Sequence, residues 1–382
     1  MKTYDIVIIG AGSVGVPLSY FCAKKGLTVA VLEKAASWGR GQNRAAIGGL
    51  RATHSDPAKI RISRISLDIV SGMKERFGID VEWRQGGYLF VAYDDPLEKA
   101  FKDLLTVQKA AGLDIDWIEP ERVLELCPGL TSEGLRGGTF SPGDGYASSL
   151  MTNTAFHKLA LDAGVEFHFG QAVSELLVRG TKILSARTGS QEYSAGLFVD
   201  AAGVDASEIG ALAGVEIPVR PDCHEGGVTE PVSRFMEPMV VDMRSDDKSG
   251  SYYFYQAETG QVVFCITPNP QVWGTDRDNT SAFLPLCARR MVELYPRLRN
   301  LKVRRTWRGS YPMTPDGLPI VGFPREIDNF LLAVGMCGQG FMLGPGLGKI
   351  LSEIIVDKSG TYEEILSELS LYRNFAGMEV LK

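Results

Sequence analysis

The turn after the first predicted strand constrains the fold most strongly. An apolar strand runs directly into Gly10, Gly12 and Gly15, which have the spacing GxGxxG. In such a turn the first glycine permits the tight bend, the second lets the backbone approach a pyrophosphate, and the third lets a helix pack on the strand. A helix and a second strand follow, and this strand ends at Glu33, whose carboxylate can accept hydrogen bonds from ribose hydroxyls. A merely tight turn would explain the glycines but not Glu33, so the sequence predicts a dinucleotide-binding βαβ unit.

The bulk composition is that of a globular protein and excludes several classes of function. The 382-residue chain has a net charge of −6 and no run of Lys and Arg, which argues against a nucleic-acid partner. No stretch reaches about 18 apolar residues, so no membrane span is expected. The first strand begins after three residues, which leaves no room for a signal peptide. The six cysteines form no CxxC pair, so we expect reduced thiols, no metal site and a cytoplasmic location.

A second glycine-rich turn lies near the other end of the chain. The apolar strand 330–334 leads into the loop 335–348, and a helix is predicted over 347–355. A strand, a glycine loop and a helix again build an anion-binding helix end. Two such loops favour one long cofactor that reaches both of them. A second dinucleotide is the weaker alternative, because no acidic strand end follows about 20 residues later.

The stretch 39–51 is rich in Gly and Arg and precedes a helix predicted over 56–77. Because it follows Glu33 directly, it is well placed to run along the rest of a long cofactor. Arg44 and Arg51 either face a phosphate or a ring there or are solvated surface charges.

Two other segments differ from the rest of the chain in their predicted secondary structure. Residues 81–149 contain a predicted hairpin over 81–92 with its tip at Gly86-Gly87, and residues 218–312 are rich in strands. The strand 251–255 is aromatic on both faces, so its tyrosines either pack the sheet or line a substrate pocket. We predict an α/β fold with a Rossmann-like cofactor domain and a discontinuous α+β substrate domain on a mixed, largely antiparallel sheet. The predicted ranges are 1–80, 150–217 and 313–382 for the cofactor domain, and 81–149 and 218–312 for the substrate domain.

Six motifs together resemble one family over nearly the whole chain. The chain is similar to the D-amino-acid oxidase-type FAD-dependent oxidoreductases, which include glycine oxidase, sarcosine oxidase and the β subunits of heteromeric sarcosine oxidase and proline dehydrogenase. The resemblance implies FAD as the cofactor of the Rossmann-like domain. The motifs are residues 10–15 with Glu33, residues 48–51, 199–203, 229–231, 313–317 and 338–342.

The resemblance also implies roles for single residues. Val173 would contact adenine through its backbone, the late glycine loop would line the pyrimidine edge of the flavin, and Arg51 would bind a substrate carboxylate. Further candidates to orient the substrate are His54, Tyr253, Tyr255 and Tyr311. The residues expected to hold FAD are Gly10, Gly12, Ser13, Val14, Gly15, Glu33, Lys34, Asn43, Arg44, Gly48, Gly49, Leu50, Val173, Ala202, Gly203, Gly309, Gly338, Gln339, Gly340, Phe341 and Met342.

Departures from the family pattern narrow the expected chemistry. Tyr311 stands where glycine oxidase has a carboxylate-binding Arg, and the strand 262–265 lacks the Lys that activates oxygen in monomeric sarcosine oxidase. The second departure indicates a dehydrogenase that passes electrons to a partner, or a poor oxidase. Gly309 stands where a Cys links the flavin in monomeric sarcosine oxidase, and residues 43–46 lack a linking His, so the FAD is expected to be noncovalent.

The function implied by these residues is FAD-dependent oxidation of an amino acid or secondary amine of the sarcosine, glycine, proline or D-amino-acid type. The Cα–H bond would deliver a hydride to flavin N5, and the resulting imine would hydrolyse. The electron acceptor would be O2, a protein or a quinone, and the chain could pair with a partner subunit or form a homo-oligomer. The alternatives are a 2-hydroxy-acid or glycerol-phosphate dehydrogenase, and a β subunit that acts only in a complex.

Overall fold

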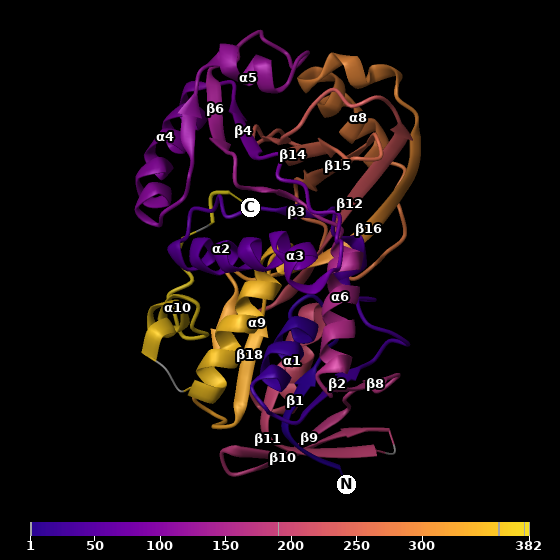
Figure 1. Ribbon diagram of the computed structural model, residues 1–382, viewed down its shortest axis with the longest axis vertical. Helices are drawn as coiled ribbons and strands as arrows, with labels where there is room; N and C mark the ends of the chain where they lie inside the picture. Colours follow the sequence, from indigo (N-terminus) through magenta and orange to yellow (C-terminus); the bar gives the residue numbers. More distant parts are fainter. Residues whose placement is uncertain (1, 190, 358–359, 378, 382) are drawn as a thin grey trace.

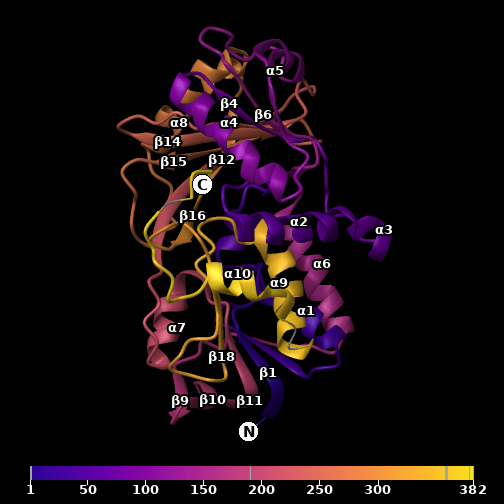
Figure 2. The ribbon, with the colours of Figure 1, turned by 90° about the vertical axis from the view of Figure 1, so that its left-hand side faces the viewer.

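The computed structural model describes residues 2–189, 191–357, 360–377 and 379–381. Two sheets of eight strands each lie at opposite ends of the molecule, the first at the lower end of Figure 1 and the second at the upper end. The helix α2 (Pro57–Ser71) lies between them in both ribbon views, and α3 (Met73–Phe77) continues from it (Figures 1 and 2).

The first sheet has a parallel core. β1 pairs in parallel with β2 and β11, β2 with β8, and β11 with β18, while β17 is antiparallel at one edge and the hairpin β9–β10 extends β11. The carboxyl ends of the parallel strands therefore meet at one edge, where open α/β sheets bind ligands. The strands are β1 (Lys2–Ile9), β2 (Val29–Glu33), β8 (Glu166–Phe169), β9 (Glu175–Arg179), β10 (Lys182–Thr188), β11 (Gln191–Asp200), β17 (Ile320–Gly322) and β18 (Phe330–Val334).

Apolar side chains fill both faces of this sheet, as expected for a parallel sheet. On β1, Ile6 and Ile8 join the core beneath the helices of one face, whereas Val7 and Ile9 join a separate core on the other face. The helices of the first face are α1 (Gly15–Lys24), α6 (Ser149–Asp162) and α9 (Gly340–Asp357), and the second face is covered by α7 (Ala206–Leu212).

The second sheet is antiparallel except for one parallel pair, β13 with β4. The helices α5 (Pro120–Leu126) and α8 (Phe283–Leu294) pack on one face, and α4 (Asp95–Ala110) contributes to the core on the other. Its strands run in the order β16 (Val303–Met313), β12 (Arg220–Pro231), β15 (Gln261–Pro268), β14 (Ser249–Gln256), β13 (Met239–Asp242), β4 (Tyr88–Ala92), β6 (Gly137–Ser141) and β5 (Asp116–Ile118).

The two mixed sheets confirm the predicted fold class, and the boundaries of the two domains stay a prediction. None of the described helices is long and apolar enough to cross a membrane. The remaining elements are short: β3 (Gly49–Leu50), β7 (Gly145–Tyr146), α10 (Glu363–Glu368) and the 3-10 helices η1 (Gln42–Ala45), η2 (Gly203–Asp205), η3 (Pro296–Asn300) and η4 (Gly360–Tyr362).

The predicted hairpin over 81–92 is wrong. Only its second half, β4, is a strand, and β4 pairs with β6 and β13 rather than with the residues before it. Gly86 does not form a hairpin tip, because its Cα lies against the Glu237 carbonyl, where an added Cβ would be 2.3 Å from the oxygen. The alternating pattern identified a strand correctly, but its partners come from distant parts of the chain.

The late glycine loop is shorter than predicted, because α9 begins at Gly340 rather than at residue 347. Glycines within α9 allow close packing against the start of the chain. A Cβ on Gly344 would lie 1.9 Å from the Ser13 carbonyl oxygen, and one on Gly348 would lie 2.7 Å from the Leu18 nitrogen. These contacts place α9 directly against the first glycine turn. Because α9 begins at Gly340, Phe341 is part of the helix.

We expect Gly344→Ala to destabilise the protein, although Ala is favoured over Gly within a helix by about 1 kcal/mol. The added methyl group would meet a backbone oxygen that cannot rotate away, and overpacking of this kind costs about 1–3 kcal/mol or more. Urea unfolding measures the difference. Gly143→Ala is the control, because its Cβ would have no atom within 4 Å. Equal stability of the two variants would contradict the close contact.

Candidate functional site

A long cavity lies between the two sheets, along the carboxyl edge of the first. Its lower wall contains the ends of β1, β2 and β18 and the turn after β11, and its upper wall contains parts of β12, β15 and β16. Its lining includes residues of both glycine-rich turns, from Gly10 and Gly12 to Gly338 and Gly340. A cavity that touches both turns suits a cofactor longer than a mononucleotide.

The glycines of the first turn have two different roles: two of them allow close backbone contacts, and one faces the cavity. Gly10 has φ +111°, and a Cβ there would lie 2.5 Å from the Ala201 carbonyl oxygen, while a Cβ on Gly15 would lie 2.0 Å from the Gly10 oxygen. Gly12 has no protein atom within 4 Å of its Cβ position and lines the cavity. Gly10 and Gly15 thus close the turn on itself, and the space at Gly12 is left for a ligand beside the start of α1.

Glu33 is fixed at one end of the cavity by the backbone. One carboxylate oxygen accepts a hydrogen bond from the Ala11 N–H at 2.9 Å, and the other accepts one from the Ala35 N–H at 2.8 Å. Val173 and Lys34 line the cavity nearby, and Lys34 forms an ion pair with Asp205 at 2.6 Å. A carboxylate held in this way keeps further lone pairs for ribose hydroxyls.

The other end of the cavity is a wall of stacked and hydrogen-bonded rings. Tyr311 stacks on His224 with their ring centroids 3.8 Å apart, and its hydroxyl lies 3.0 Å from the Tyr253 hydroxyl. Burial raises the pKa of both tyrosines far above the ordinary value and raises that of the Cys265 thiol to about 11. These three groups are therefore uncharged near neutral pH. Gly338 makes room for the wall, since a Cβ on it would lie 2.3 Å from the Tyr311 ring.

The residues around the cavity fit FAD. Five of the fifteen buried side-chain polar atoms that lack a hydrogen-bond partner in the described part of the chain lie at or next to this cavity, and such atoms are rare in folded proteins unless a ligand or water satisfies them. They are Asn43 Oδ1, His224 Nδ1 and Ser310 Oγ on the cavity wall, with Asp200 Oδ2 and Gln339 Oε1 on residues next to it. The glycine cradle and the Glu33 carboxylate supply the phosphate and ribose sites that a dinucleotide needs.

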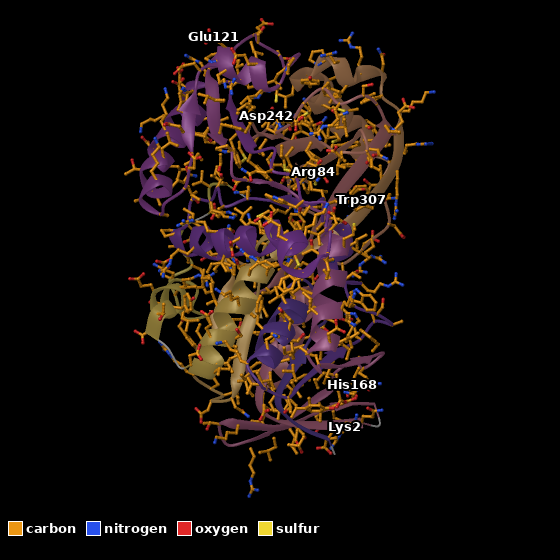
Figure 3. All side chains as sticks on the ribbon, viewed as in Figure 1. Lys2, Arg84, Glu121, His168, Asp242 and Trp307 are labelled. Atoms are coloured by element: carbon orange, nitrogen blue, oxygen red, sulfur yellow. The ribbon has the colours of Figure 1, made fainter. Side chains whose placement is uncertain are left out.

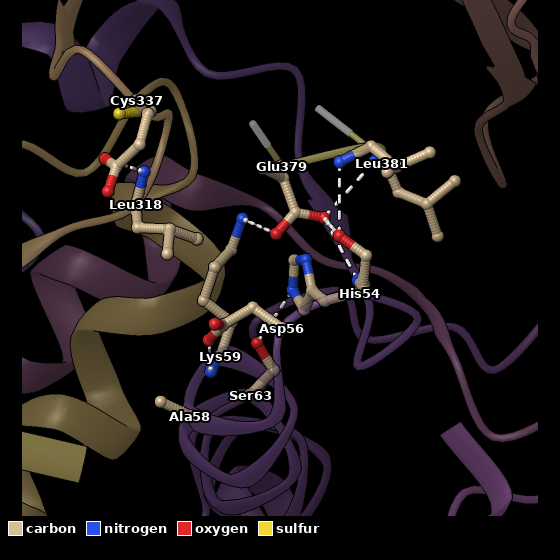
Figure 4. A network of polar contacts seen from close by, with 12 residues as sticks. His54, Asp56, Ala58, Lys59, Ser63, Leu318, Cys337, Glu379 and Leu381 are labelled. Carbon is tan, nitrogen blue, oxygen red and sulfur yellow. Dashed lines mark hydrogen bonds and ion pairs between the residues drawn. The ribbon is translucent and has the colours of Figure 1, made fainter. Parts of the chain in front are cut away.

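His54 lies in a buried polar network (Figure 4) rather than on the cavity wall. Arg51 contacts His54 and is likewise not among the residues that line the cavity. Arg51 donates to the Thr53 carbonyl and, at 2.5 Å, to the Leu381 carbonyl, and one of its nitrogens lies 3.2 Å from His54 Nδ1. The second His54 nitrogen lies 3.0 Å from the Ser63 hydroxyl. Burial lowers the pKa of His54 well below its ordinary value, and the Arg51 charge lowers it further, so this imidazole stays neutral.

The last described residues of the chain are anchored by a fully buried ion pair. Glu379 lies 2.9 Å from the Lys59 ammonium, both side chains are 0% exposed, and Glu379 also accepts hydrogen bonds from the Ser55 N–H and hydroxyl. Burial alone would raise the pKa of Glu379, but Lys59 and Ser55 lower it to about 2. The anchor brings Leu381 into the aromatic core of the second sheet, beside Tyr255.

A second hollow adjoins the cavity and shares the wall at residues 45–47. Figure 3 shows two of its lining residues, Arg84 and Trp307, near the middle of the molecule. Its other basic lining residues are Arg40, Arg44, Arg277, Arg305 and Arg308.

The structure thus sorts the candidate residues into three groups. Fifteen line the long cavity: Gly10, Gly12, Ser13, Val14, Glu33, Lys34, Asn43, Val173, Ala202, Gly203, Gly309, Tyr311, Gly338, Gly340 and Phe341. Three line the second hollow: Arg44, Gly48 and Tyr255. The remaining eight support these walls or lie behind them: Gly15, Gly49, Leu50, Arg51, His54, Tyr253, Gln339 and Met342.

The sequence analysis gave no role to Asp222 and His224. His224 lines the cavity, and its Nε2 lies 3.1 Å from the buried Asp222 carboxylate. The signal was present, because an Asp-x-His pair on a strand places both side chains on one face.

Comparison with known proteins agrees with this geometry. A family model described as "FAD dependent oxidoreductase" matches residues 5–354. The sarcosine oxidase subunit beta of Arthrobacter sp is 29% identical, over 93% of this chain and 88% of that protein. The sarcosine dehydrogenase of Mus musculus is 27% identical over 93% of this chain, which spans 40% of its length. The solved L-proline dehydrogenase of P.horikoshii is 29% identical with a TM-score of 0.91, over 97% of this chain and 98% of that one.

We expect Lys59→Met to destabilise the protein by about 3–5 kcal/mol, because removal of one partner leaves the other charge buried and unpaired. The double variant Lys59→Met/Glu379→Leu should be more stable than Lys59→Met alone, since no buried charge remains. Urea unfolding at pH 7 measures both. The matched control is Lys74→Met, which breaks an exposed pair with Asp80 and should cost about 0–1 kcal/mol. Equal effects of Lys59→Met and Lys74→Met would contradict the buried anchor.

We expect Asp200→Asn to flatten the pH dependence of stability. Burial raises the pKa of Asp200 to about 8, so the folded state holds a proton that the unfolded state releases near pH 4. Stability is then lost as the pH rises from about 4 to about 8. The melting temperature of the wild type should fall more steeply between pH 6 and pH 9 than that of the variant. The exposed Asp103→Asn should behave like the wild type, and parallel curves for all three would contradict the shift.

Proposed function

Because the chain belongs to the FAD-dependent oxidoreductase family, we propose that it oxidises a small amino acid or secondary amine at the carbon that bears the nitrogen. The observation that carries the proposal is the ring wall at the end of the cavity away from Glu33, formed by Tyr311, Tyr253 and His224. Burial raises the pKa of Tyr311 and Tyr253 and so keeps both tyrosines neutral, which suits a small substrate. The names of the relatives support the same chemistry.

A phosphate-bearing substrate fits the cavity less well. Among the described residues that line it, the basic side chains are Lys34 and Arg277, and Lys34 is paired with Asp205 near the Glu33 end. A phosphate ester at the ring wall would need several clustered basic groups. The cavity therefore favours an amine over a glycerol phosphate.

Bound FAD would supply the acceptor for the two electrons and the hydrogen of the Cα–H bond. The glycine turn at Gly12 and the carboxylate of Glu33 would hold its adenosine half, and the loop at Gly338 would lie beside its ring system. Tyr311 and Tyr253 would close the substrate side and orient the amine through their linked hydroxyls. We propose that the FAD is noncovalent, since Gly309 offers no side chain for a bond.

Arg51 is the proposed partner of the substrate carboxylate. A guanidinium has five N–H donors, and the contacts to Thr53, Leu381 and His54 use three of them. Two of its donors are left for a ligand, and the guanidinium lies 5.3 Å from the Phe90 ring centroid.

The electron acceptor is proposed to be a protein or a quinone rather than O2. The strand 262–265 contains no Lys, so it supplies no positive charge to assist oxygen. The likeness to a named subunit of a heteromeric enzyme supports a partner subunit as the acceptor, and a homo-oligomer is the alternative.

The decisive experiment is an anaerobic titration of the FAD-loaded protein with sarcosine, glycine, L-proline and D-alanine. We expect at least one of them to bleach the flavin absorbance, and pyrrolidine or dimethylamine, which lack the carboxylate, to bleach it far more slowly. Reoxidation should be faster with an artificial acceptor than with air. No bleaching by any amine, together with bleaching by lactate or glycerol 3-phosphate, would overturn the proposal.

A further inference from the structure

Asp222 and His224 form an isolated acid–imidazole pair on the wall of the cavity. The Asp222 carboxylate is 1% exposed, and one of its oxygens accepts a hydrogen bond from the Val272 N–H at 2.8 Å. The other oxygen lies 3.1 Å from His224 Nε2. His224 Nδ1 is buried and has no partner among the described residues. Nε2 of the imidazole therefore has a hydrogen-bond partner, whereas Nδ1 has none among the described residues.

The carboxylate decides which tautomer the neutral imidazole adopts. A carboxylate only accepts hydrogen bonds, so Nε2 must carry the proton that lies between the two side chains. Nδ1 is then a lone pair, which can accept a proton and cannot donate one. If Nδ1 takes up a proton, the resulting imidazolium is stabilised by Asp222, as in other carboxylate–histidine pairs.

Amine oxidation needs such an acceptor. An aliphatic amine with an ordinary pKa near 10, as in the Lys side chain, is an ammonium ion at neutral pH. Its nitrogen lone pair must be free before the neighbouring C–H bond can give up a hydride, because the lone pair becomes the second bond of the imine. A group in the cavity that takes the ammonium proton would therefore let the ammonium form of the substrate react.

The other histidines do not line the cavity. The sequence contains four histidines. His54 has contacts at both nitrogens and lies behind the wall. His157 stacks on Trp38 with their ring centroids 3.8 Å apart, and His168 lies at the far edge of the first sheet beside Tyr4, where Figure 3 labels it near Lys2. His224 is thus the histidine that lines the cavity.

We propose that His224 accepts the proton of the substrate ammonium group at Nδ1 and that Asp222 positions its ring. This inference rests on the proposed amine oxidation. In the step, the N–H bond of the ammonium breaks, an Nδ1–H bond forms, and the electron pair of the broken bond stays on the substrate nitrogen. The imidazolium donates a hydrogen bond from Nε2 to Asp222. The step is a proton transfer, so it needs no oxidant or reductant.

The other titratable groups near the Asp222–His224 pair are either neutral or bound to partners of their own. Tyr311 stacks on the imidazole and Cys265 lies on the neighbouring strand, and burial keeps both of them protonated near neutral pH. Glu225 is turned to Thr280, from which it accepts two hydrogen bonds. Of the basic groups on the adjacent segments, Arg308 is paired with Asp276 and Arg277 donates to the Arg40 carbonyl.

The test measures flavin reduction by stopped flow as a function of pH, with whichever amine of the titration panel the wild type oxidises fastest. His224→Gln should lower the limiting rate at pH 7 by about 10²–10⁴-fold, the usual contribution of a general base. The loss should shrink at pH 10, where about half of the amine in solution is neutral. Asp222→Asn should lower the rate and move its pH dependence. His168→Gln is the matched control and should follow the wild type.

A second measurement does not depend on activity. In ¹⁵N spectra of the histidine-labelled protein, assigned by single substitutions, His224 should show an unprotonated Nδ1 and a protonated Nε2. Asp222→Asn should change the fraction of His224 that carries its proton on Nε2 rather than on Nδ1.

The inference and the proposed function fail in different ways. If no amine bleaches the wild type, the proposed function is wrong. If an amine bleaches the wild type and His224→Gln has the same rate and pH profile, or if Nδ1 carries the proton in the neutral wild type, His224 is not the acceptor. Far-UV circular dichroism and FAD content show that the variants are folded.

Discussion

The close contact between α9 and the first glycine turn is the constraint on which the site depends. Gly344 brings the backbone of the late helix against Ser13, and Gly348 brings it against the start of α1, at distances that admit no side chain. The two glycine-rich turns are separated by more than 300 residues in the sequence, yet this contact places both on one cavity. A single ligand can therefore touch the βα turn at Gly12 and the loop at Gly338, which is the geometric basis for one long cofactor rather than two.

The sequence predicted the cofactor end of the site better than the substrate end. The glycine turn, the acidic end of β2 and the helices around them are local features, because each follows from the order of small, apolar and acidic residues within about 30 positions. The predicted hairpin over 81–92 failed for the opposite reason. β4 has a clear strand pattern, but its partners β6 and β13 come from about 50 and 150 residues away, and alternation alone carries no information about the partner.

Local patterns also failed to show the surroundings of Arg51 and His224, because their partners come from distant segments of the chain. The motif around Arg51 identified an important arginine, but its partners, the carbonyl of Leu381 and the ring of Phe90, come from two other segments. Nothing local indicates that Lys59, on α2, pairs with Glu379 near the end of the chain. The sequence assigned no role to His224, because its significance comes from the stacking on Tyr311 and from the cavity beside it. Burial and long-range partners, rather than residue type, separate these groups from the other charged side chains.

Charge is distributed unevenly along the cavity, and this distribution matches the chemistry of the reacting end. Near Glu33 the walls carry both acidic and basic side chains, which suits a polar adenosine and its phosphates. At the ring wall, burial keeps Tyr253, Tyr311 and Cys265 neutral, so the Asp222 carboxylate is the fixed charge beside the imidazole. An electrostatic interaction is strong in such a weakly polar region. Asp222 therefore stabilises the imidazolium that forms when His224 takes up a proton at Nδ1, while the substrate nitrogen keeps the electron pair that the oxidation of its neighbouring carbon requires.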